Sequence, residues 1–339
     1  MTQVDRSTVA VEQPGRAGSV TKPPSGKAGE AGPTRPRLTR RHRFQRDWVL
    51  IVAAVPGIVI LLVFHYLPWL GNVIAFKDYQ PYIGIVESPW VGFDNFGVLV
   101  NGDPKFLNAL TNTLIITLLQ VLVVFPAPIA LALLLDSLIS ERVKRITQSI
   151  LYLPHFLSWV IVVAIFQVIL GNTGPLNNFL RQHDLSTISI IANPDLFKVL
   201  VTSQVLWKDA GWATILFLAA LSRIDINLYE AAAVDGAGRW RQLWHVTLPG
   251  LRSLIVLLLI IRLGDSLTVG FEQILLQEPA VGREASEVLD TYVYNHAILE
   301  ADWGAGAAVG LVKGLIGVAL VLGANALAHR FGERGVYQR

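Results

Sequence analysis

The sequence predicts an all-α, polytopic membrane protein with six transmembrane helices and with both termini on the cytoplasmic side. Composition is the first observation: of 339 residues, 53% are hydrophobic and 16% are charged, and the mean hydropathy is +0.49. A soluble domain usually carries about a quarter charged residues, so much of this surface is expected to face lipid. The other two observations are six long apolar runs and an alternation of basic and non-basic connecting segments.

The first 47 residues differ in composition from the rest of the chain. They are rich in Pro, Gly, Ser and Thr and contain ten basic residues, the last four being Arg40, Arg41, Arg43 and Arg46. We interpret residues 1–47 as a disordered, basic cytoplasmic tail that lies near anionic lipid headgroups. The apolar run that begins near Trp48 has no small-residue cleavage pattern after it, so a removable signal peptide is not expected.

Six apolar segments follow, each long enough to span a bilayer. A helix needs about 20 apolar residues, at about 1.5 Å per residue, to cross about 30 Å of hydrocarbon. Long continuous runs predict helices, whereas a barrel would show alternating strands of about ten residues. The predicted spans are Trp48–Leu70, Leu107–Leu135, Ile146–Leu170, Leu196–Leu221, Gly250–Phe271 and Gly304–Leu327. They form one domain, residues 48–330, and residues 331–339 form a short cytoplasmic tail.

The orientation follows from the charge of the loops. Basic residues occupy the N-terminal tail, two alternate loops and the C-terminal end; the loop residues are Arg142, Lys144 and Arg145, then Arg223, Arg239 and Arg241. The positive-inside rule places these segments in the cytoplasm, and six is the span count that keeps the bias consistent. The segment between the fifth and sixth spans is acidic, with Glu272, Glu278, Glu284, Glu287, Asp290, Glu300 and Asp302, and is predicted to lie outside.

Polar residues interrupt four of the spans at one level. The rise per residue puts them about 18 to 23 Å from the cytoplasmic ends. A charge facing lipid costs at least about 2.5 kcal/mol near the bilayer centre, so the set is expected to face a shared hydrated or paired interior. The alternatives are local structural pairs, or side chains that snorkel to the interface. The residues are Gln120, Lys208, Asp209, Arg262, Asp265 and Lys313.

Aromatic residues flank the charged pair of the fourth span. Trp207 precedes Lys208, and Trp212 follows Asp209 with Gly211 beside it. Indole rings stack on sugar faces, but they also mark membrane interfaces. We include Trp207, Gly211 and Trp212 with the polar set as candidates for a substrate pathway.

The loop between the fourth and fifth spans, residues 222–249, has the pattern of a docking element. It reads as a short helix, a turn permitted by Gly236, a second amphipathic stretch, and Pro249 in the first turn of the next span. Its alanine run gives a thin helix with a flat face, suited to a groove on another protein. The alternative is a surface helix parallel to the membrane, with Trp240 and Trp244 at the headgroups.

This loop resembles the EAA loop of inner-membrane permease subunits of binding-protein-dependent ABC importers. Glu230-Ala231-Ala232 is followed after three residues by Gly236, then after nine by Val246, and then by Leu248-Pro249. Val246 stands where the pattern usually has Ile. The resemblance implies the ABC importer type I permease fold and a coupling helix that docks on the ATPase. The residues it assigns to that role are Tyr229, Glu230, Ala231, Ala232, Asp235, Gly236, Leu248 and Pro249.

Further motifs resemble the carbohydrate-uptake permeases, especially the oligo- and polysaccharide group. The similarity covers about residues 45–338 and includes Ile74-Ala-Phe-Lys-Asp-Tyr79, Ser88-Pro-Trp-Val-Gly92, Trp207-Lys-Asp-Ala-Gly-Trp212, Arg262-Leu-Gly264, Gly270-Phe-Glu-Gln273 and Asp290-Thr-Tyr-Val-Tyr294. That group commonly has Glu at the position of Asp209, and an apolar or amide residue at that of Asp265. The resemblance implies import of an oligosaccharide or sugar derivative by alternating access.

The same resemblance implies several partners. The chain has no G-x-x-x-x-G-K-[ST] loop, so ATP is expected to bind a separate, cytoplasmic ABC ATPase dimer rather than this chain. Six spans form half a pathway, which implies a second permease subunit in a heterodimer, and an extracellular solute-binding protein delivers the carbohydrate. No cofactor, metal site or catalytic residue is predicted. Nucleic acid is disfavoured, because the basic residues lie in a tail and short loops.

Two other classes of function are compatible with charged residues inside spans. An ion- or proton-coupled secondary transporter also carries intramembrane Asp and Lys, but the docking loop and the lack of an evident repeat count against it. A membrane-embedded enzyme would use Asp209, Asp265 and His155. No H-E-x-x-H spacing is present, and a carboxylate pair alone is weak support for catalysis.

Overall fold

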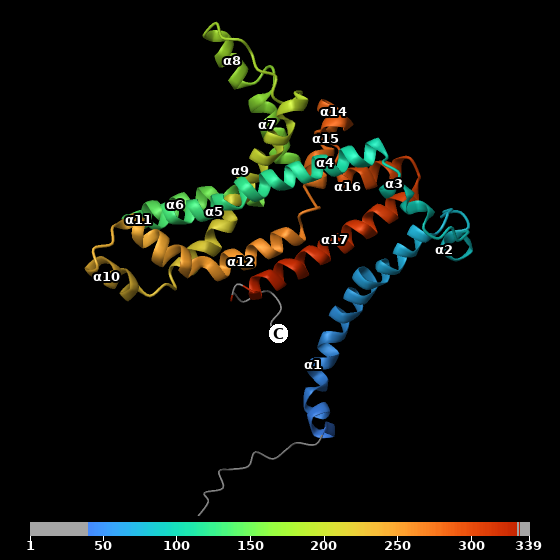
Figure 1. The fold of residues 1–339 in the computed structure, drawn as a ribbon, viewed down its shortest axis with the longest axis horizontal. Helices are drawn as coiled ribbons and strands as arrows, with labels where there is room; N and C mark the ends of the chain where they lie inside the picture. The colour runs from blue at the N-terminus through green and yellow to red at the C-terminus, as the bar shows by residue number, and fades with distance from the viewer. Residues whose placement is uncertain (1–39, 331, 333–339) are drawn as a thin grey trace, which may run out of the picture. The chain divides into compact units, whose positions relative to one another are not determined.

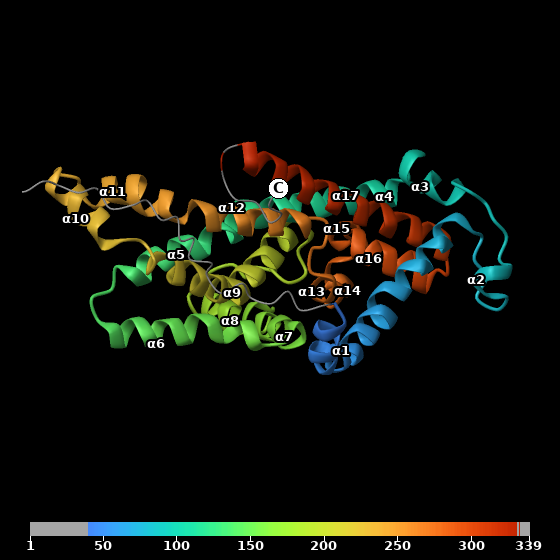
Figure 2. The same ribbon diagram turned by 90° about the horizontal axis from the view of Figure 1, so that it is seen from below.

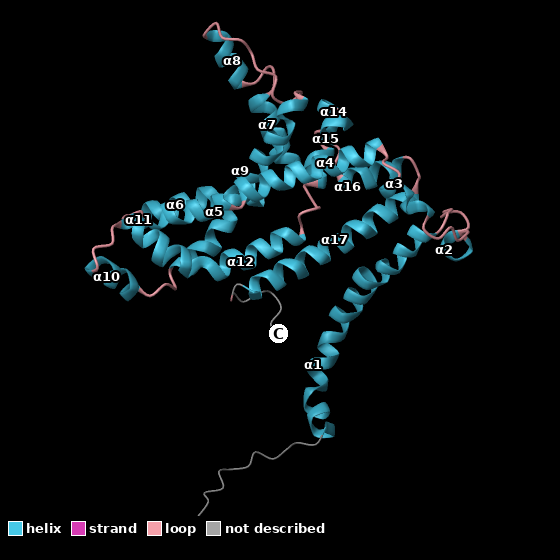
Figure 3. Cartoon of the chain, in the orientation of Figure 1, coloured by secondary structure: helices cyan, strands magenta, loops and turns pink. Residues whose placement is uncertain are grey.

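The computed structural model describes residues 40–330 and residue 332, with side chains described from Trp48 onward. The predicted tails, residues 1–47 and 331–339, therefore fall largely outside the described residues. The described part of the chain is helical, with connecting loops and no strand, as Figure 3 shows. This agrees with the predicted all-α class.

The chain divides into two units, residues 1–62 and residues 63–339. The first contains α1 (Arg40–Leu61), which has Pro56 inside it. This helix begins at Arg40 rather than near Trp48, so helical structure starts inside the segment that was predicted to be a disordered tail. The apolar residues of α1 from Trp48 onward are exposed, as expected for a helix whose solvent is lipid.

After α1 the chain continues, across the boundary between the two units, with short elements and two long helical runs. The short elements are η1 (Leu62–Tyr66), η2 (Leu67–Phe76), α2 (Gly84–Glu87), η3 (Asp94–Phe96) and α3 (Gly97–Val100). The runs are α4 (Pro104–Leu119), η4 (Gln120–Val124) and α5 (Pro126–Asp136), then α6 (Glu141–Tyr152), η5 (Leu153–Phe156), α7 (Trp159–Leu170) and α8 (Pro175–Gln182). The Asp103 carboxylate caps α4 by accepting from the backbone N–H of Lys105 at 3.1 Å.

Helix α9 (Pro194–Leu221) lies at the centre of the second unit, against α4, α5, α6 and α12 (Figures 1 and 2). It is followed by α10 (Ile226–Val234), α11 (Arg239–Gln242), η6 (Leu243–Thr247) and α12 (Leu248–Gly264). The connection from residue 265 to residue 302 holds α13 (Phe271–Leu275), α14 (Glu278–Val281), α15 (Arg283–Ser286), α16 (Leu289–Val293) and η7 (Tyr294–Leu299). The last helix, α17 (Trp303–Arg330), packs beside α12 and η2.

Two clusters of buried apolar side chains surround the two ends of α9. Phe197 and Val201 pack with Ile116, Val269, Ile274 and Val288 near its start. Phe217 and Leu221 pack with Ala132 and Leu251 near its end. Burial of both ends explains how an apolar helix with polar and charged residues at its middle is kept in one position.

Five helical segments are long and apolar enough to cross a membrane: Trp48–Phe76, Pro104–Asp136, Trp159–Gln182, Arg239–Gly264 and Trp303–Arg330. A sixth is obtained if α9 and α10, which meet at 71°, are counted as one bent span. The predicted third span, Ile146–Leu170, is wrong as a continuous helix, because the chain breaks between α6 and α7. The predicted fifth span, Gly250–Phe271, is too long, because α12 ends at Gly264 and residues 265–270 are not helical.

Candidate functional site

Lys208 stabilises the break between α6 and α7. Its Nζ donates hydrogen bonds to the carbonyl oxygens of His155 at 2.7 Å and of Leu157 at 2.6 Å. The side chain is 8% exposed and lies over the ring of Trp159, 5.5 Å from the centroid. Carbonyls at a helix break lack helical partners, so the ammonium supplies the hydrogen bonds that the backbone has lost. Its donors are engaged with backbone rather than directed into an open pathway.

Gly211 brings the backbone of α9 against the same break. A Cβ at this position would lie 2.0 Å from the carbonyl oxygen of Leu151, a distance that side chains do not reach without displacement of the backbone. The residue is therefore a close-packing position between α9 and the end of α6.

Asp209 holds the side chain of His155. The Asp209 Oδ1 and His155 Nδ1 atoms are 2.9 Å apart, and the imidazole stacks on Trp212 with centroids 4.8 Å apart and planes at 7°. Phe156 meets the indole edge-on at 6.2 Å. The break thus presents an ordered aromatic group whose indole plane is fixed by a histidine and a carboxylate.

A cavity of about 360 Å³ lies beside this group. Its polar lining consists of Asp209, Arg262 and Asp265, with Trp212 as the large aromatic. Val124, Phe125, Pro128, Val205 and Phe217 are among its apolar lining residues. Arg262 donates to Oε1 of Gln120, which is the first residue of the π-helix η4. An apolar cavity with a few convergent polar groups has the character of a ligand site.

Asp265 also lines a second cavity, of about 470 Å³, between α12 and α17. Lys313 lies there, and its Nζ forms an ion pair with Oδ1 of Asp290. The structure therefore groups Asp209, Trp212, Arg262 and Asp265 around the first cavity and places Lys313 at the other. Gln120 is not a lining residue and contacts the cavity only through Arg262. Trp207 is not among the lining residues and meets Phe166 edge-on at 5.8 Å.

Sequence reasoning missed several functional contacts. The sequence suggests only one role for His155, that of a catalytic candidate in the membrane-enzyme alternative. A polar residue directly after Pro154 inside an apolar run is, however, itself a signal of a helix break. The sequence places Asp290 in the acidic segment and in the Asp290-Thr-Tyr-Val-Tyr294 motif, but does not predict its partner. Its pairing with Lys313 places a charge from the 265–302 connection opposite the last helix.

Three glutamines join α9 to the 265–302 connection. Gln204 and Gln277 exchange side-chain hydrogen bonds at 3.0 Å, and Gln273 donates to Gln204 at 2.6 Å and to the carbonyl of Val201 at 2.9 Å. All three side chains are buried. A buried amide cluster with its groups paired fixes the geometry of the elements that it joins.

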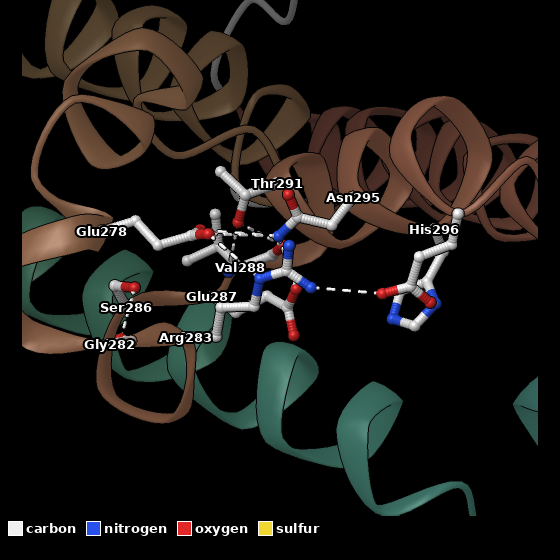
Figure 4. Close-up of polar contacts among 10 residues, drawn as sticks. Glu278, Gly282, Arg283, Ser286, Glu287, Val288, Thr291, Asn295 and His296 are labelled. Atoms are coloured by element: carbon white, nitrogen blue, oxygen red, sulfur yellow. Dashed lines mark hydrogen bonds and ion pairs between the residues drawn. The ribbon is translucent and has the colours of Figure 1, made fainter.

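A network of charged and polar side chains holds residues 278–300 of the 265–302 connection together (Figure 4). Arg283 contacts Glu278 at 3.3 Å and Glu300 at 3.2 Å, and His296 lies 2.8 Å from Glu300. Asn295 donates to Glu287 at 2.8 Å. Lys105, Asn108, Arg283, Glu284, Glu287 and His296 line a cleft of about 330 Å³.

Tyr292 ties this connection to the start of α4. Burial raises the pKa of its phenol, and the hydroxyl donates to the Asp103 carboxylate at 3.1 Å.

The predicted docking loop folds as two helices separated by a turn. Tyr229, Glu230, Ala231 and Ala232 lie in α10; Asp235 follows its last residue, and Gly236 has a φ of +74°. A left-handed conformation of this kind favours glycine. Leu248 and Pro249 form the first turn of α12. Val234, at the end of α10, is 88% exposed, so the loop presents apolar surface at its tip.

Long apolar helices, an apolar cavity with a few convergent polar groups and an exposed helix–turn–helix loop are typical of a membrane-embedded transport subunit. No group of three potential metal ligands occurs among residues 40–330 that the structure describes.

Comparison with known proteins identifies the family to which this membrane protein belongs. Residues 124–333 match the family described as "Binding-protein-dependent transport system inner membrane component", and the chain belongs to that family. It is a multi-pass membrane permease and not an enzyme.

Two relatives from Bacillus subtilis (strain 168) are each 44% identical. Protein LplB aligns over 294 residues, 86% of this chain and 92% of the relative. The polygalacturonan/rhamnogalacturonan transport system permease protein YteP aligns over 289 residues, 85% and 90% respectively. A chain in the crystal structure of a bacterial alginate ABC transporter, in complex with alginate pentasaccharide-bound periplasmic protein, superposes with a TM-score of 0.79 at 36% identity. The match covers 87% of this chain and 99% of that chain.

Proposed function

We propose that this chain is one of two permease subunits of an ABC importer for an oligosaccharide or sugar derivative. A cytoplasmic ATPase dimer binds and hydrolyses ATP, an extracellular binding protein delivers the solute, and the permease pair alternates its access. The observation that carries the proposal is the α10–α12 loop, whose exposed helix, left-handed Gly236 and following Pro249 suit it to a groove on a motor protein.

Carbohydrate is the solute class favoured by the relatives and by the cavity. The relatives include permeases named for polygalacturonan/rhamnogalacturonan and, at 30% identity over 260 residues, for arabinooligosaccharides. Trp212 offers an indole whose orientation is fixed by His155, and Asp209, Asp265 and Arg262 offer acceptors and donors for hydroxyl groups. Aromatic faces combined with a few polar groups suit the apolar faces and hydroxyl edges of sugar rings.

The topology that we propose has six spans, with both termini and the 222–249 loop in the cytoplasm. Residues 48–330 form the permease domain, and residues 1–47 and 331–339 are cytoplasmic tails. Support comes from the basic residues of α6 and of the 222–249 loop, and from the acidic 265–302 connection.

The test is transport by the assembled complex in proteoliposomes. The chain is co-purified with its second permease and ATPase, and uptake of an oligogalacturonide, arabinotriose and lactose is measured with the binding protein outside and ATP inside. We expect ATP-dependent uptake of at least one of these sugars. Uptake that needs no ATP and collapses with the ion gradient would establish the secondary-transporter alternative instead.

A further inference from the structure

A side-chain hydrogen bond joins the helix of the docking loop to the base of the next span. The Tyr229 hydroxyl and the Thr247 Oγ1 are 3.0 Å apart. Tyr229 lies in the middle of α10, and Thr247 is the last residue of η6, directly before α12. Thr247 is 7% exposed. Because it is covered, it cannot itself contact a docked protein, although its partner belongs to the docking helix.

Packing holds the remainder of the loop to the same place. Gly250 in the first turn of α12 packs against Ile224, since a Cβ at Gly250 would lie 2.8 Å from the Ile224 Cδ1. The Gln242 side chain donates to the carbonyl of Ala237 at 3.0 Å, which closes the turn after Gly236. Residues before and after α10 are therefore tied to the segment that starts α12, and the Tyr229–Thr247 bond ties the middle of α10.

The far end of α12 reaches the cavity that Asp209, Arg262 and Asp265 line. Arg262 follows Thr247 by fifteen positions, or about 22 Å at the helical rise. Arg262 donates to Gln120 and lines the cavity with Asp265. Both Thr247 and Gln120 lie in π-helices, η6 and η4. Single π-turns within α-helical runs recur at functional sites, because the extra residue disturbs the regular hydrogen-bond ladder.

We propose that the Tyr229–Thr247 hydrogen bond passes displacement of α10 to α12 and so to the cavity wall, which makes the two residues positioning residues for the ATP-driven step. This inference rests on the proposed function. Without the bond, α10 still docks on the ATPase, but part of its movement is lost before it reaches Arg262. ATP hydrolysis then continues with less solute moved for each ATP.

The experiment measures sugar imported per ATP hydrolysed in the reconstituted complex, using whichever of the three oligosaccharides gives the highest wild-type uptake. Thr247→Val keeps the shape of the side chain and removes the hydroxyl, and Tyr229→Phe removes the other partner. A net hydrogen bond is worth about 1 kcal/mol, so each variant is expected to lower the ratio about fivefold. The double variant is expected to be no worse than Thr247→Val alone, which removes the shared contact and also the 3.5 Å hydrogen bond from Thr247 Oγ1 to the carbonyl of Gln242.

Two further variants separate this role from a structural one. Thr247→Ser keeps the hydroxyl and should restore the ratio. Tyr82→Phe is the matched control, since it deletes a tyrosine hydroxyl that donates to Gln80 at 2.8 Å, far from the loop in sequence. An unchanged ratio in Tyr229→Phe, or additive losses in the double variant, would overturn the inference. If Thr247→Val fails to assemble, Tyr229→Phe decides. Failure of the wild-type chain to bind any ATPase would instead overturn the proposed function.

Discussion

At the scale of single residues, the charges inside the spans divide into two kinds. Lys208 donates to the two carbonyls of the α6–α7 break, and Lys313 pairs with Asp290. Asp209, Arg262 and Asp265 line the cavity. A buried ammonium is tolerated where its donors are satisfied, so the two lysines hold helices together. We propose that the three cavity residues face the solute.

The role of Lys208 can be tested by stability. Lys208→Met keeps most of the side-chain volume but leaves two carbonyls without their donor, which should lower the apparent Tm by about 5 °C or more. Thermal unfolding in detergent is the measurement. Lys198→Met, on the same helix and half-buried, is the matched control and should change the Tm little. Equal Tm shifts in the two variants would show that Lys208 does not stabilise the break between α6 and α7.

The cavity residues are tested by transport. Arg262→Ala removes the positive charge from the cavity lining and the donor to Gln120, and should reduce uptake at least tenfold, since about 1.4 kcal/mol corresponds to a factor of ten. Asp265→Ala should also reduce uptake. Initial rates in proteoliposomes are compared with those of Arg142→Ala, which alters a basic residue in α6. If both cavity variants take up sugar at the wild-type rate, Arg262 and Asp265 serve as structural pairs and not as solute contacts.

At the scale of elements, the sequence predicted the helices better than their interruptions. Long apolar runs identify spans because each run must bury its backbone polar groups within itself. The end of α12 at Gly264 was missed because Leu267 and Val269 continue the apolar run while the backbone leaves the helix. The break after Tyr152 was missed because its stability comes from Lys208, which is distant in sequence.

The same cause limited prediction of the candidate site. Depth counted along straight helices grouped Lys313 with Arg262, although the 265–302 connection supplies Lys313 with its own partner, Asp290. By contrast, the docking loop depends on local turn chemistry, so its helix α10 and the left-handed Gly236 follow the predicted pattern, and Pro249 lies in the first turn of α12. The helical segment itself already begins at Arg239, ahead of the predicted span. The sequence predicts features that depend on local turn chemistry, but it does not predict contacts between segments that lie far apart in the chain.

The turn in this loop gives a matched pair of substitutions. Gly236 has a φ of +74°, whereas Gly238 has a φ of −68°, and a Cβ added at either position would meet open space within 4 Å. Gly236→Ala should weaken association with the ATPase by about fivefold or more, because a left-handed alanine costs about 1–2 kcal/mol. Gly238→Ala should leave association unchanged. Pull-down of the ATPase subunit measures both, and equal binding by the two variants would contradict the turn requirement.

At the scale of the whole molecule, the proposed orientation is testable because the chain contains no cysteine. A single cysteine at Val234, in the docking loop, should react with a membrane-impermeant maleimide only in inside-out vesicles. One at Val86, between the first two spans, should react only in right-side-out vesicles. Both positions are highly exposed, with 88% and 89% of their surface accessible. The reverse labelling pattern would invert the topology.

The residues that hold the break between α6 and α7 differ from those that line the cavity. This separation affects how a permease of this kind can change its substrate. Lys208 and Gly211 serve the main chain of a neighbouring helix, and that requirement is the same whatever the cargo. Arg262 and Asp265 lie at the end of α12, apart from those contacts, and line the cavity. If these residues contact the sugar as we propose, exchange of a few of them is a short evolutionary route to a new substrate, because it leaves the framework that holds the broken helix untouched.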